Sequence, residues 1–376
     1  MLEFEVSFYV IYIFLLGILV FFGFFIESKK ELAYKKQESS LDAKLICLSE
    51  LVVIIPFRNE EKRIECLLKS ILASNELPKE FIFVNDHSSD RSVDLIAKKL
   101  IGIPYRVLEL PEDQEGKKRA IRYAIEQSSS DYILSYDADI EFNPNYFSKL
   151  KNLLEADLYI LPAILKAKKF HEHLYEVDLI LVNAANCGIA GLKRPIMASG
   201  ANLLYKREAF NKYDNFESHS HMPSGDDIYL LRDFRKQNAA IRLITDTTFS
   251  IETETPQSLK EFFNQRLRWI AKTGDVKDHL STSLAIIQVV LTFCFVLIAG
   301  ILAFNGQWKI FMVCYILKTT VDMLIFLPYF NRIKRMKSWL FIPIYELLFP
   351  IYSLVILCAM YLYKPVWKGR RLDKNY

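Results

Sequence analysis

The sequence predicts an α/β protein whose central sheet is mostly parallel and Rossmann-like, with apolar segments before and after it. Short apolar stretches alternate with amphipathic ones between residues 50 and 140. Strands that are apolar throughout are typical of a parallel sheet covered by helices on both faces. Polar clusters follow three of the four strands, and much of the 52% hydrophobic content is concentrated in a few long runs.

The alternating part contains four expected strands and three expected helices. The strands are predicted at 50–56, 81–84, 105–110 and 132–136, and the helices at 60–73, 90–100 and 116–127. Ligands of such sheets bind beyond the carboxyl ends of the strands. Because PFRNEE (56–61), NDHSSD (85–90) and DADIE (137–141) follow three of these strands, we expect these clusters to meet at one rim.

Four apolar runs are long enough to cross a bilayer, which takes roughly 20 apolar residues. They cover residues 6–26, 281–304, 308–330 and 339–363. The first is expected to be a retained anchor (1–27), because its start is acidic and its apolar stretch exceeds that of a signal peptide. Four lysines then begin the predicted linker, 28–48. By the positive-inside rule they place the globular domain, 49–279, on the cytoplasmic side of a cell (inner) membrane.

The end of the chain leaves two arrangements open. The predicted C-terminal membrane region, 280–364, holds two spans and then the run 339–363, and a basic tail, 365–376, follows. Four full crossings would put this tail outside, against the positive-inside rule. The last run therefore either crosses or bends at Pro350 and lies partly in the interface.

Charge and cysteine content argue against two classes of protein. The net charge of +4 implies no broad nucleic-acid-binding surface. The six cysteines form no CxxC pair, so they are expected to be reduced packing residues of a cytoplasmic domain and not a disulfide framework.

Two carboxylates separated by one small residue, Asp137 and Asp139, stand where a buried strand is expected to end. Such a pair can bind a divalent cation, since Mg²⁺ typically uses one or two carboxylates plus substrate phosphates. GKKRA (116–120) opens a predicted helix, and a helix N-terminus with Lys117 or Arg119 suits phosphate. The alternative is that the aspartates form a solvated turn.

Two later motifs also carry charge at helix ends. Asp226 and Asp227 begin a predicted helix in SGDDIYLL, where they are either functional or ordinary N-terminal acidic residues. QRLRW (265–269) lies late in a predicted amphipathic helix, 257–273, just before the second apolar run. The alternative there is an interfacial helix, with Trp269 at the headgroup level and arginines at the phosphates.

In this order PFRNE, NDHSSD, GKKRA, DAD, SGAN (199–202), GDD and QRLRW resemble the motifs of the family 2 glycosyltransferases. The resemblance covers roughly residues 50–272. Within this family, the motifs are similar more narrowly to the membrane-bound branch that includes ceramide glucosyltransferase and the cellulose and hyaluronan synthases. The tail VWKGRRL is similar to that of ceramide-glucosyltransferase-like members. It implies a GT-A fold, a nucleotide-sugar donor that is UDP-linked, and Mg²⁺ or Mn²⁺ as cofactor. Two positions depart from the pattern: Asp226, where the family usually has Glu, and Arg58, where relatives vary.

The resemblance also implies a role for each matching residue. Asp227 is implied as the catalytic base and Asp139 as the metal ligand. Asp86 is implied to bind the nucleobase and the ribose of the donor. The full implied set is Asp227 and Asp226 for catalysis; Phe57, Glu60, Asp86, Lys117, Asp137, Asp139, Gln265 and Arg268 for the donor; and Gly200 and Trp269 for the acceptor.

The implied reaction is transfer of a sugar, with inversion, to a membrane lipid. A metal ion and an arginine would stabilise the leaving diphosphate, and a carboxylate would take the acceptor's proton. The apolar segments around the domain favour a lipid acceptor and a single transfer. A processive polysaccharide synthase and a polyprenyl-phosphate glycosyltransferase stay open as alternatives. An inactive binding protein and a nucleotidyltransferase are the competing classes.

Several charged residues outside these motifs are weaker candidates. The pairs His171/His173 and His219/His221 are expected on a solvated surface and not at a metal. Lys318 and Asp322, one helical turn apart in an apolar run, are either functional or neutralise each other. Glu346 is expected to contact an acceptor headgroup or a neighbouring helix.

Overall fold

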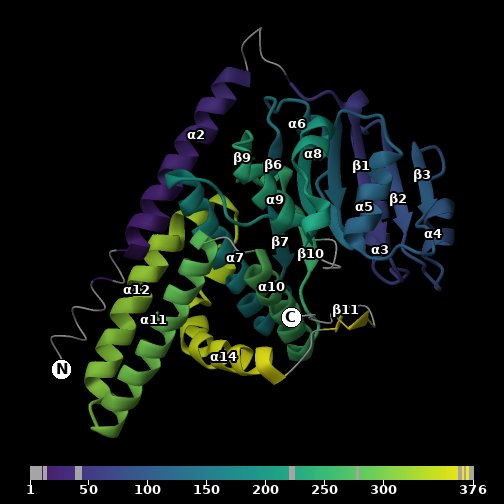
Figure 1. Ribbon diagram of the computed structural model, residues 1–376. Helices are drawn as coiled ribbons and strands as arrows, with labels where there is room; N and C mark the ends of the chain where they lie inside the picture. Colours follow the sequence, from purple (N-terminus) through teal and green to yellow (C-terminus); the bar gives the residue numbers. More distant parts are fainter. Residues whose placement is uncertain are drawn as a thin grey trace.

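A seven-stranded mixed sheet forms the centre of the globular part, and long helices extend from one side of it (Figure 1). This computed structural model describes residues 11, 15–38, 45–219, 225–276, 279–362, 366–367 and 370–371. The strand order is β3-β2-β1-β4-β8-β6-β9. The first four strands are mutually parallel, β8 runs antiparallel to both neighbours, and β9 is parallel to β6.

The predicted alternation of strands and helices over residues 50–140 is confirmed. The elements are β1 (Leu51–Phe57), α3 (Ile64–Leu72), β2 (Glu80–Asn85), α4 (Ser92–Lys99), β3 (Tyr105–Glu109), α5 (Lys117–Glu126) and β4 (Tyr132–Tyr136). Each of the three helices joins two strands of the sheet. Since the connections return to parallel neighbours, the loops after β1, β2 and β4 emerge at the same edge.

A second, three-stranded sheet explains the turn that contains the two aspartates. β5 (Ile140–Phe142) pairs antiparallel with β10 (Ile251–Glu254), which pairs parallel with β7 (Ala163–Lys166). The chain therefore leaves the large sheet at Tyr136 and enters the small sheet at Ile140. Asp137 and Asp139 lie in the tight turn between the two sheets.

The remaining globular elements follow in chain order. They are η2 (Leu48–Glu50), α6 (Tyr146–Leu150), β6 (Leu158–Ile160), α7 (Phe170–Leu192), β8 (Asn202–Lys206), α8 (Arg207–Tyr213), η3 (Phe216–His219), α9 (Asp226–Lys236), β9 (Ile241–Leu243), η4 (Thr247–Phe249) and α10 (Leu259–Val276). α10 corresponds to the amphipathic helix predicted at 257–273.

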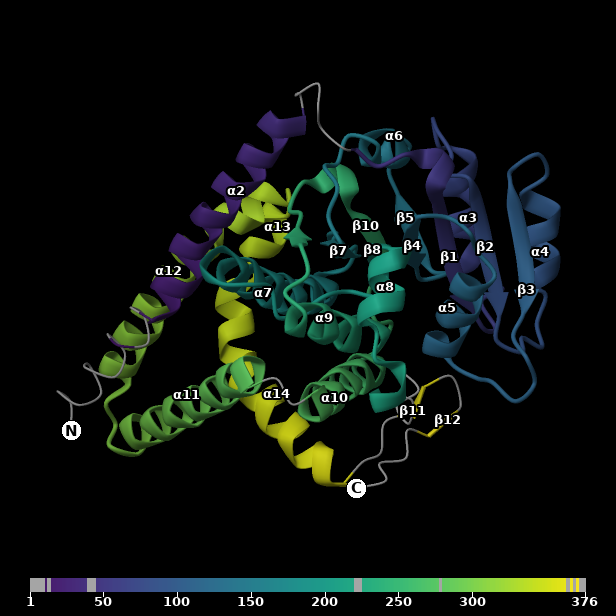
Figure 2. The ribbon, with the colours of Figure 1, turned by 45° about the horizontal axis from the view of Figure 1, so that its top comes forward.

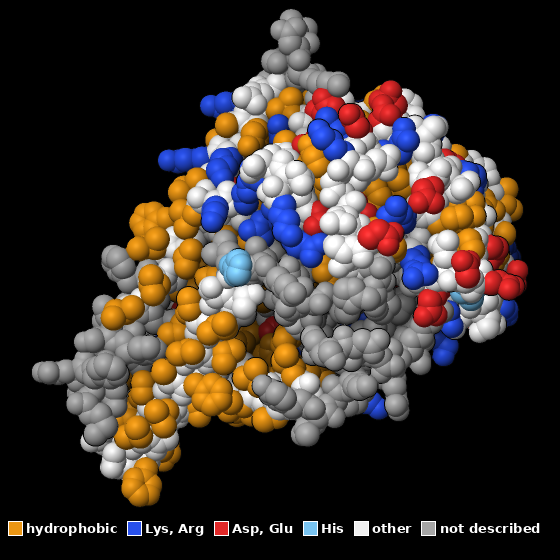
Figure 3. Space-filling view, viewed as in Figure 1, with side chains coloured by type: hydrophobic (Ala, Val, Ile, Leu, Met, Phe, Trp, Pro, Cys, Tyr) orange, Lys and Arg blue, Asp and Glu red, His pale blue; other side chains and the backbone are white. Residues whose placement is uncertain are grey.

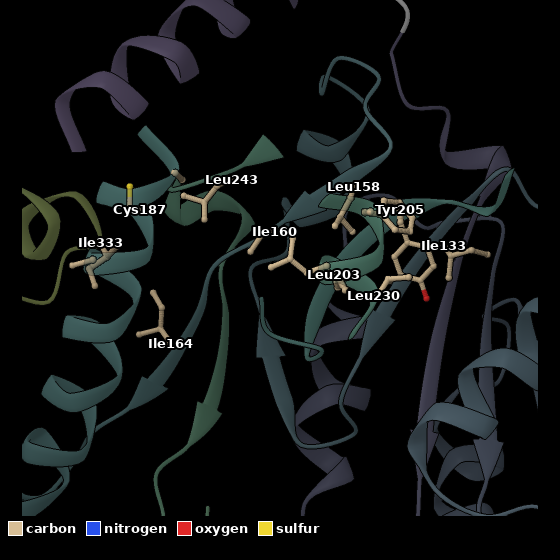
Figure 4. Packing of buried hydrophobic residues seen from close by; sticks show 14 of the residues in the cluster. Ile133, Leu158, Ile160, Ile164, Cys187, Leu203, Tyr205, Leu230, Leu243 and Ile333 are labelled. Atoms are coloured by element: carbon tan, nitrogen blue, oxygen red, sulfur yellow. The ribbon is translucent and has the colours of Figure 1, made fainter. Parts of the chain in front are cut away.

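The two faces of the sheet belong to different hydrophobic cores. Alternate residues of β1 point to opposite faces, so Val52 and Ile54 belong to one core, and Val53 and Ile55 to the other. The core containing Val52 continues past the sheet through Cys187 of α7 to Ile333, just after α12 (Figure 4). The globular part and the apolar helices thus share one core, although the sequence suggested a separate domain tethered at its ends.

The N-terminal helix packs directly on the globular part. A π-helical turn, η1 (Gly17–Phe22), leads into α2 (Gly23–Glu38), so the helix extends into the predicted linker. It crosses α7 at glycines: a Cβ on Gly23 would lie 2.0 Å from the carbonyl oxygen of Gly188, and one on Gly191 would lie 1.8 Å from that of Gly23. Residues 1–10 and 12–14 of the first apolar run lie outside the described residues.

Three helices in the described part of the chain are long and apolar enough to cross a membrane: Thr282–Phe304, Trp308–Arg332 and Ile342–Met360. They belong to α11 (His279–Phe304), α12 (Trp308–Arg332) and α14 (Ile342–Leu362), with α13 (Met336–Trp339) before the last. Hydrophobic side chains cover the outside of the α11–α12 pair, whereas charged side chains gather on the globular part (Figure 3).

The helix α14 does not run alongside the α11–α12 pair but crosses it, and it lies beside α10 (Figures 1 and 2). It contains Pro350. Beyond α14, Val366–Trp367 (β11) and Arg370–Arg371 (β12) form a short antiparallel pair, and the rest of the tail lies outside the described residues. Whether the run 339–363 crosses the bilayer remains a prediction.

Charges inside the apolar helices pair with one another. Lys318 of α12 donates to Asp322 at 2.7 Å and also to Glu346 of α14. The predicted pair is therefore part of a group of three charged residues that links two helices. Of the two roles expected for Glu346, contact with a neighbouring helix is the one observed.

Candidate active site

All twelve residues of the catalytic, donor and acceptor set implied by the family resemblance line one cavity of about 420 Å³. They are Phe57, Glu60, Asp86, Lys117, Asp137, Asp139, Gly200, Asp226, Asp227, Gln265, Arg268 and Trp269. They come from strand-end loops, helix starts and α10, which are far apart in the sequence. The fold therefore brings them together in one site.

The loops after β1 and β2 form one end of the cavity. Asp86 is buried, its backbone N–H donates to the carbonyl of Phe57 at 2.9 Å, and its carboxylate accepts from the N–H of Gly116 at 3.2 Å. Arg58 donates to the Asp86 carbonyl at 3.0 Å. These contacts fix the Asp86 carboxylate at the rim.

Lys117 connects two of the acidic motifs. Its ammonium lies 2.7 Å from Asp137 and 3.0 Å from Asp226, and it donates to the Gly200 carbonyl at 3.0 Å. Burial alone would lower the pKa of this lysine, but the two carboxylates outweigh burial and raise it. Lys117 therefore stays charged across the physiological range.

Asp139 lies at the other side of the turn, where arginines face it. Its carboxylate is 3.7 Å from Arg63, which also donates to Glu261 of α10 at 3.2 Å. Burial lowers the pKa of Arg268, while Asp137 and Asp139 oppose that shift. The two aspartates line the cavity and are partly exposed, with side-chain exposures of 41% and 27%, and carboxylate oxygens are ligands that hard cations prefer.

Asp227 is held by backbone donors at the start of α9. One carboxylate oxygen accepts from the Gly200 N–H at 3.2 Å and the other from the Ile228 N–H at 2.8 Å. A side chain at Gly200 would displace the ion pair between Lys117 and Asp226, because a Cβ would lie 2.3 Å from Asp226 and 2.9 Å from the Lys117 ammonium. The SGAN loop thus closes against both members of the GDD motif.

Helix α10 turns its motif residues toward the cavity. Gln265, Arg268 and Trp269 line it. Arg266 is buried with 4% exposure and does not reach the surface. The alternative of an interfacial helix with its arginines at lipid phosphates is therefore wrong for Arg266, and Arg268 faces the cavity.

Part of the cavity wall is apolar, and sequence reasoning missed it. Ile160, Leu165, Leu179, Met197 and Tyr329 line it. Tyr329 comes from α12, one of the helices long enough to cross a membrane. No local motif marks these residues, because they are ordinary core types brought together by packing. Arg63 was also missed, although its place one turn after PFRNE is a usable signal.

Asp214, His219 and Asp233 have ligand atoms close enough together to hold a metal ion. His219 Nδ1, however, lies 2.6 Å from the Lys118 ammonium, and Arg232 lies 2.8 Å from Asp233. Two cations already occupy the places next to these ligands, so the group fits a charge-paired structural network better than a metal. His219 is 2% exposed, so its expected place on a solvated surface is wrong; His221 lies outside the described residues.

The fold and the cavity together define the GT-A class of glycosyltransferase folds. Residues 52–214 match the family Glycosyl transferase family 2. This matched stretch is a Glycosyl transferase family 2 domain, and it contains Asp86, the DAD turn and Gly200.

Similar proteins agree with this assignment over limited stretches. The poly-beta-1,6-N-acetyl-D-glucosamine synthase of Staphylococcus aureus (strain COL) is 33% identical over 105 residues, 28% of this chain and 24% of that protein. The synthase of the same name from Staphylococcus epidermidis is 32% identical over 81 residues, 22% of this chain and 19% of that protein. The chain spans about a quarter of the length of such relatives, or less.

A solved structure supports the fold over most of the chain. The mannosyltransferase PcManGT from Pyrobaculum calidifontis, in complex with GDP-Man and Mn²⁺, matches with a TM-score of 0.51 and 14% identity. The match covers 89% of this chain and 99% of that one. At this identity the likeness concerns the fold alone.

Proposed function

We propose that this protein transfers a sugar, with inversion, from a nucleoside-diphosphate sugar to a hydroxyl group of a membrane lipid. One observation carries the proposal: a single cavity is lined both by carboxylates and cations of six motifs and by apolar residues, the apolar end, among them Tyr329 of α12. A polar donor and a lipid acceptor both find matching surfaces there. The three helices that are long and apolar enough to cross a membrane support a membrane location.

The donor end suits a nucleoside diphosphate and a divalent cation, Mg²⁺ or Mn²⁺. Asp139, with Asp137 beside it, would hold the ion, which supplies positive charge against the leaving diphosphate. Arg268 adds a second positive charge over the same carboxylates. Asp86 and Phe57, which line the cavity, would contact the nucleotide base and the ribose, and UDP is the carrier that the family resemblance favours.

Asp227 is the proposed base. The acceptor O–H gives its proton to the Asp227 carboxylate, the oxygen bonds to the anomeric carbon, and the bond from that carbon to the diphosphate oxygen breaks. The two backbone N–H groups at 3.2 and 2.8 Å hold the carboxylate in place. One base without a covalent intermediate gives inversion.

A processive polysaccharide synthase is the second candidate, because the curated relatives carry that name. Their match covers 28% of this chain, so it supports the alternative without deciding the acceptor. The apolar cavity end favours a lipid over a growing sugar polymer.

The test uses the full chain in lipid nanodiscs with labelled UDP-sugars, membrane lipid extract and Mn²⁺. We expect a lipid carrying one sugar by mass spectrometry, with free nucleoside diphosphate as the second product. A long polymer would favour the synthase, and release of pyrophosphate would point to a nucleotidyltransferase.

The variant Asp227→Asn tests the assignment of the base. It keeps the shape and one acceptor oxygen, so donor binding should persist, while transfer should fall by roughly 10²–10⁴-fold. Isothermal titration with the donor separates the two effects. Normal transfer by this variant would refute the base assignment.

A further inference from the structure

We infer that Asp178 and Arg266 are positioning residues that fix Gln265 and Trp269 of the cavity wall and couple them to helix α14. The inference deepens the proposed function, on which its kinetic readout rests. Neither residue lines the cavity; both lie behind it, in the layer between α10 and the apolar helices.

Asp178 of α7 gathers contacts from two other helices. One of its carboxylate oxygens accepts from the hydroxyl of Tyr345 at 2.6 Å and from that of Tyr352 at 2.8 Å. The other forms an ion pair with Arg266 of α10. Asp178 and Arg266 are only 3% and 4% exposed, so this pair is closed off from water.

Arg266 in turn contacts two cavity residues. Its guanidinium donates to the side-chain oxygen of Gln265 at 3.3 Å and lies 4.3 Å from the ring centre of Trp269. It also lies 4.7 Å from the ring centre of Phe262. A planar guanidinium can stack on rings and pair with a carboxylate at the same time, which a lysine ammonium cannot reproduce.

The arrangement gives a direct route from a membrane-side helix to the site. Tyr345 and Tyr352 are seven residues apart on α14, so they lie on one face and reach the same oxygen. A shift of α14 would move Asp178, then Arg266, and with it the ring of Trp269. Packing alone would not require a buried ion pair at this place, since apolar residues fill such space at least as well.

The kinetic test compares Asp178→Asn with a matched control on the same helix. Glu176 lies two residues earlier, is 2% exposed and is 3.1 Å from Arg335, but its partners Arg335 and Ser338 lie near α13 and not on α10. We expect Asp178→Asn to lower kcat by roughly 10–100-fold, because small misplacements of site groups are costly, with the donor Kd unchanged. Glu176→Gln should change kcat less than about threefold; equal losses in both variants would overturn the inference.

A second variant addresses folding. Asp178→Asn leaves the arginine charge buried and alone, whereas Asp178→Asn with Arg266→Met removes both charges and avoids that penalty. We expect this double variant to fold with a Tm close to that of the parent and still show the lowered kcat. Full recovery of kcat together with Tm would mean that the pair serves stability alone and would overturn the inference.

A readout independent of activity uses Trp269 fluorescence after the other three tryptophans have been replaced by phenylalanine. Asp178→Asn should increase acrylamide quenching of Trp269 by about twofold. Tyr352→Phe should increase it by less than twofold, and Glu176→Gln should leave it unchanged. Unchanged quenching in Asp178→Asn would overturn the inference. If the parent transfers no sugar, the proposed function fails while this measurement still decides the positioning role.

Discussion

The two ends of the cavity are built in different ways. The proposed donor end is made of short loops that follow β1, β2 and β4, together with Lys117 of α5 and Gln265 and Arg268 of α10. The apolar end collects residues from β6, β7, α7 and α12, which span residues 160–329. The charged residues thus lie in short sequence motifs, whereas the apolar residues come together through long-range packing. Substitutions at the two ends should therefore change different kinetic constants.

The largest effect is expected at the donor end. Asp139→Asn should lower kcat by roughly 10²–10³-fold, the usual loss when one electrostatic contribution to the transition state is removed, and should weaken dependence on added Mn²⁺. Initial rates over a Mn²⁺ titration check this.

The control for that variant is Glu141→Gln. Glu141 follows two residues later but lies 2.5 Å from Lys166 and does not line the cavity, so its rates should stay near the parent's. If the two variants behaved alike, the metal assignment to Asp139 would be wrong.

A smaller, selective effect is expected at the apolar end. Leu179→Ala removes apolar contact worth about 1 kcal/mol, which corresponds to a roughly fivefold higher KM for the proposed lipid acceptor, with the KM for the donor unchanged. Leu181→Ala, on the same helix but outside the cavity wall, is the matched control. A change in the donor KM instead would contradict the proposal that the two ends of the cavity bind different substrates.

The smallest effect concerns the contact between α2 and the globular part. Burial raises the pKa of Asp246, but hydrogen bonds from Lys35 and Thr248 lower it more, to about 2. Since the folded pKa is lowered, the carboxylate stabilises the fold above the unfolded pKa of about 3.9, and this contribution is lost as pH falls toward 2.

Asp246→Asn keeps the cap to Thr248 but removes the charge. At neutral pH it should cost at most about 1 kcal/mol of the free energy of unfolding, because Lys35 is 42% exposed. Denaturant unfolding of the parent and the variant at pH 7 and pH 3 measures this, and the difference should shrink at the lower pH. A constant difference would mean that the charge contributes nothing.

The sequence predicted the first half of the fold and the polar half of the site. Strand alternation placed β1 to β4, and motif order brought Asp86, Asp139 and Asp227 to one cavity as expected. The sequence did not predict Leu179 or Tyr329, because their residue types are those of any core. It also placed His219 on the surface, since a histidine's burial depends on partners such as Lys118 that lie 101 residues away.

The core that runs from Val52 through Cys187 to Ile333 has a practical consequence. Cutting the chain before α11 to obtain a water-soluble enzyme would strip away Phe326, Tyr329 and Phe330, each of which is at most 8% exposed. The truncation would expose the hydrophobic residues of the globular part that pack against them, next to the cavity. Studies of this enzyme therefore need the intact chain in detergent or nanodiscs, and a shortened version should aggregate.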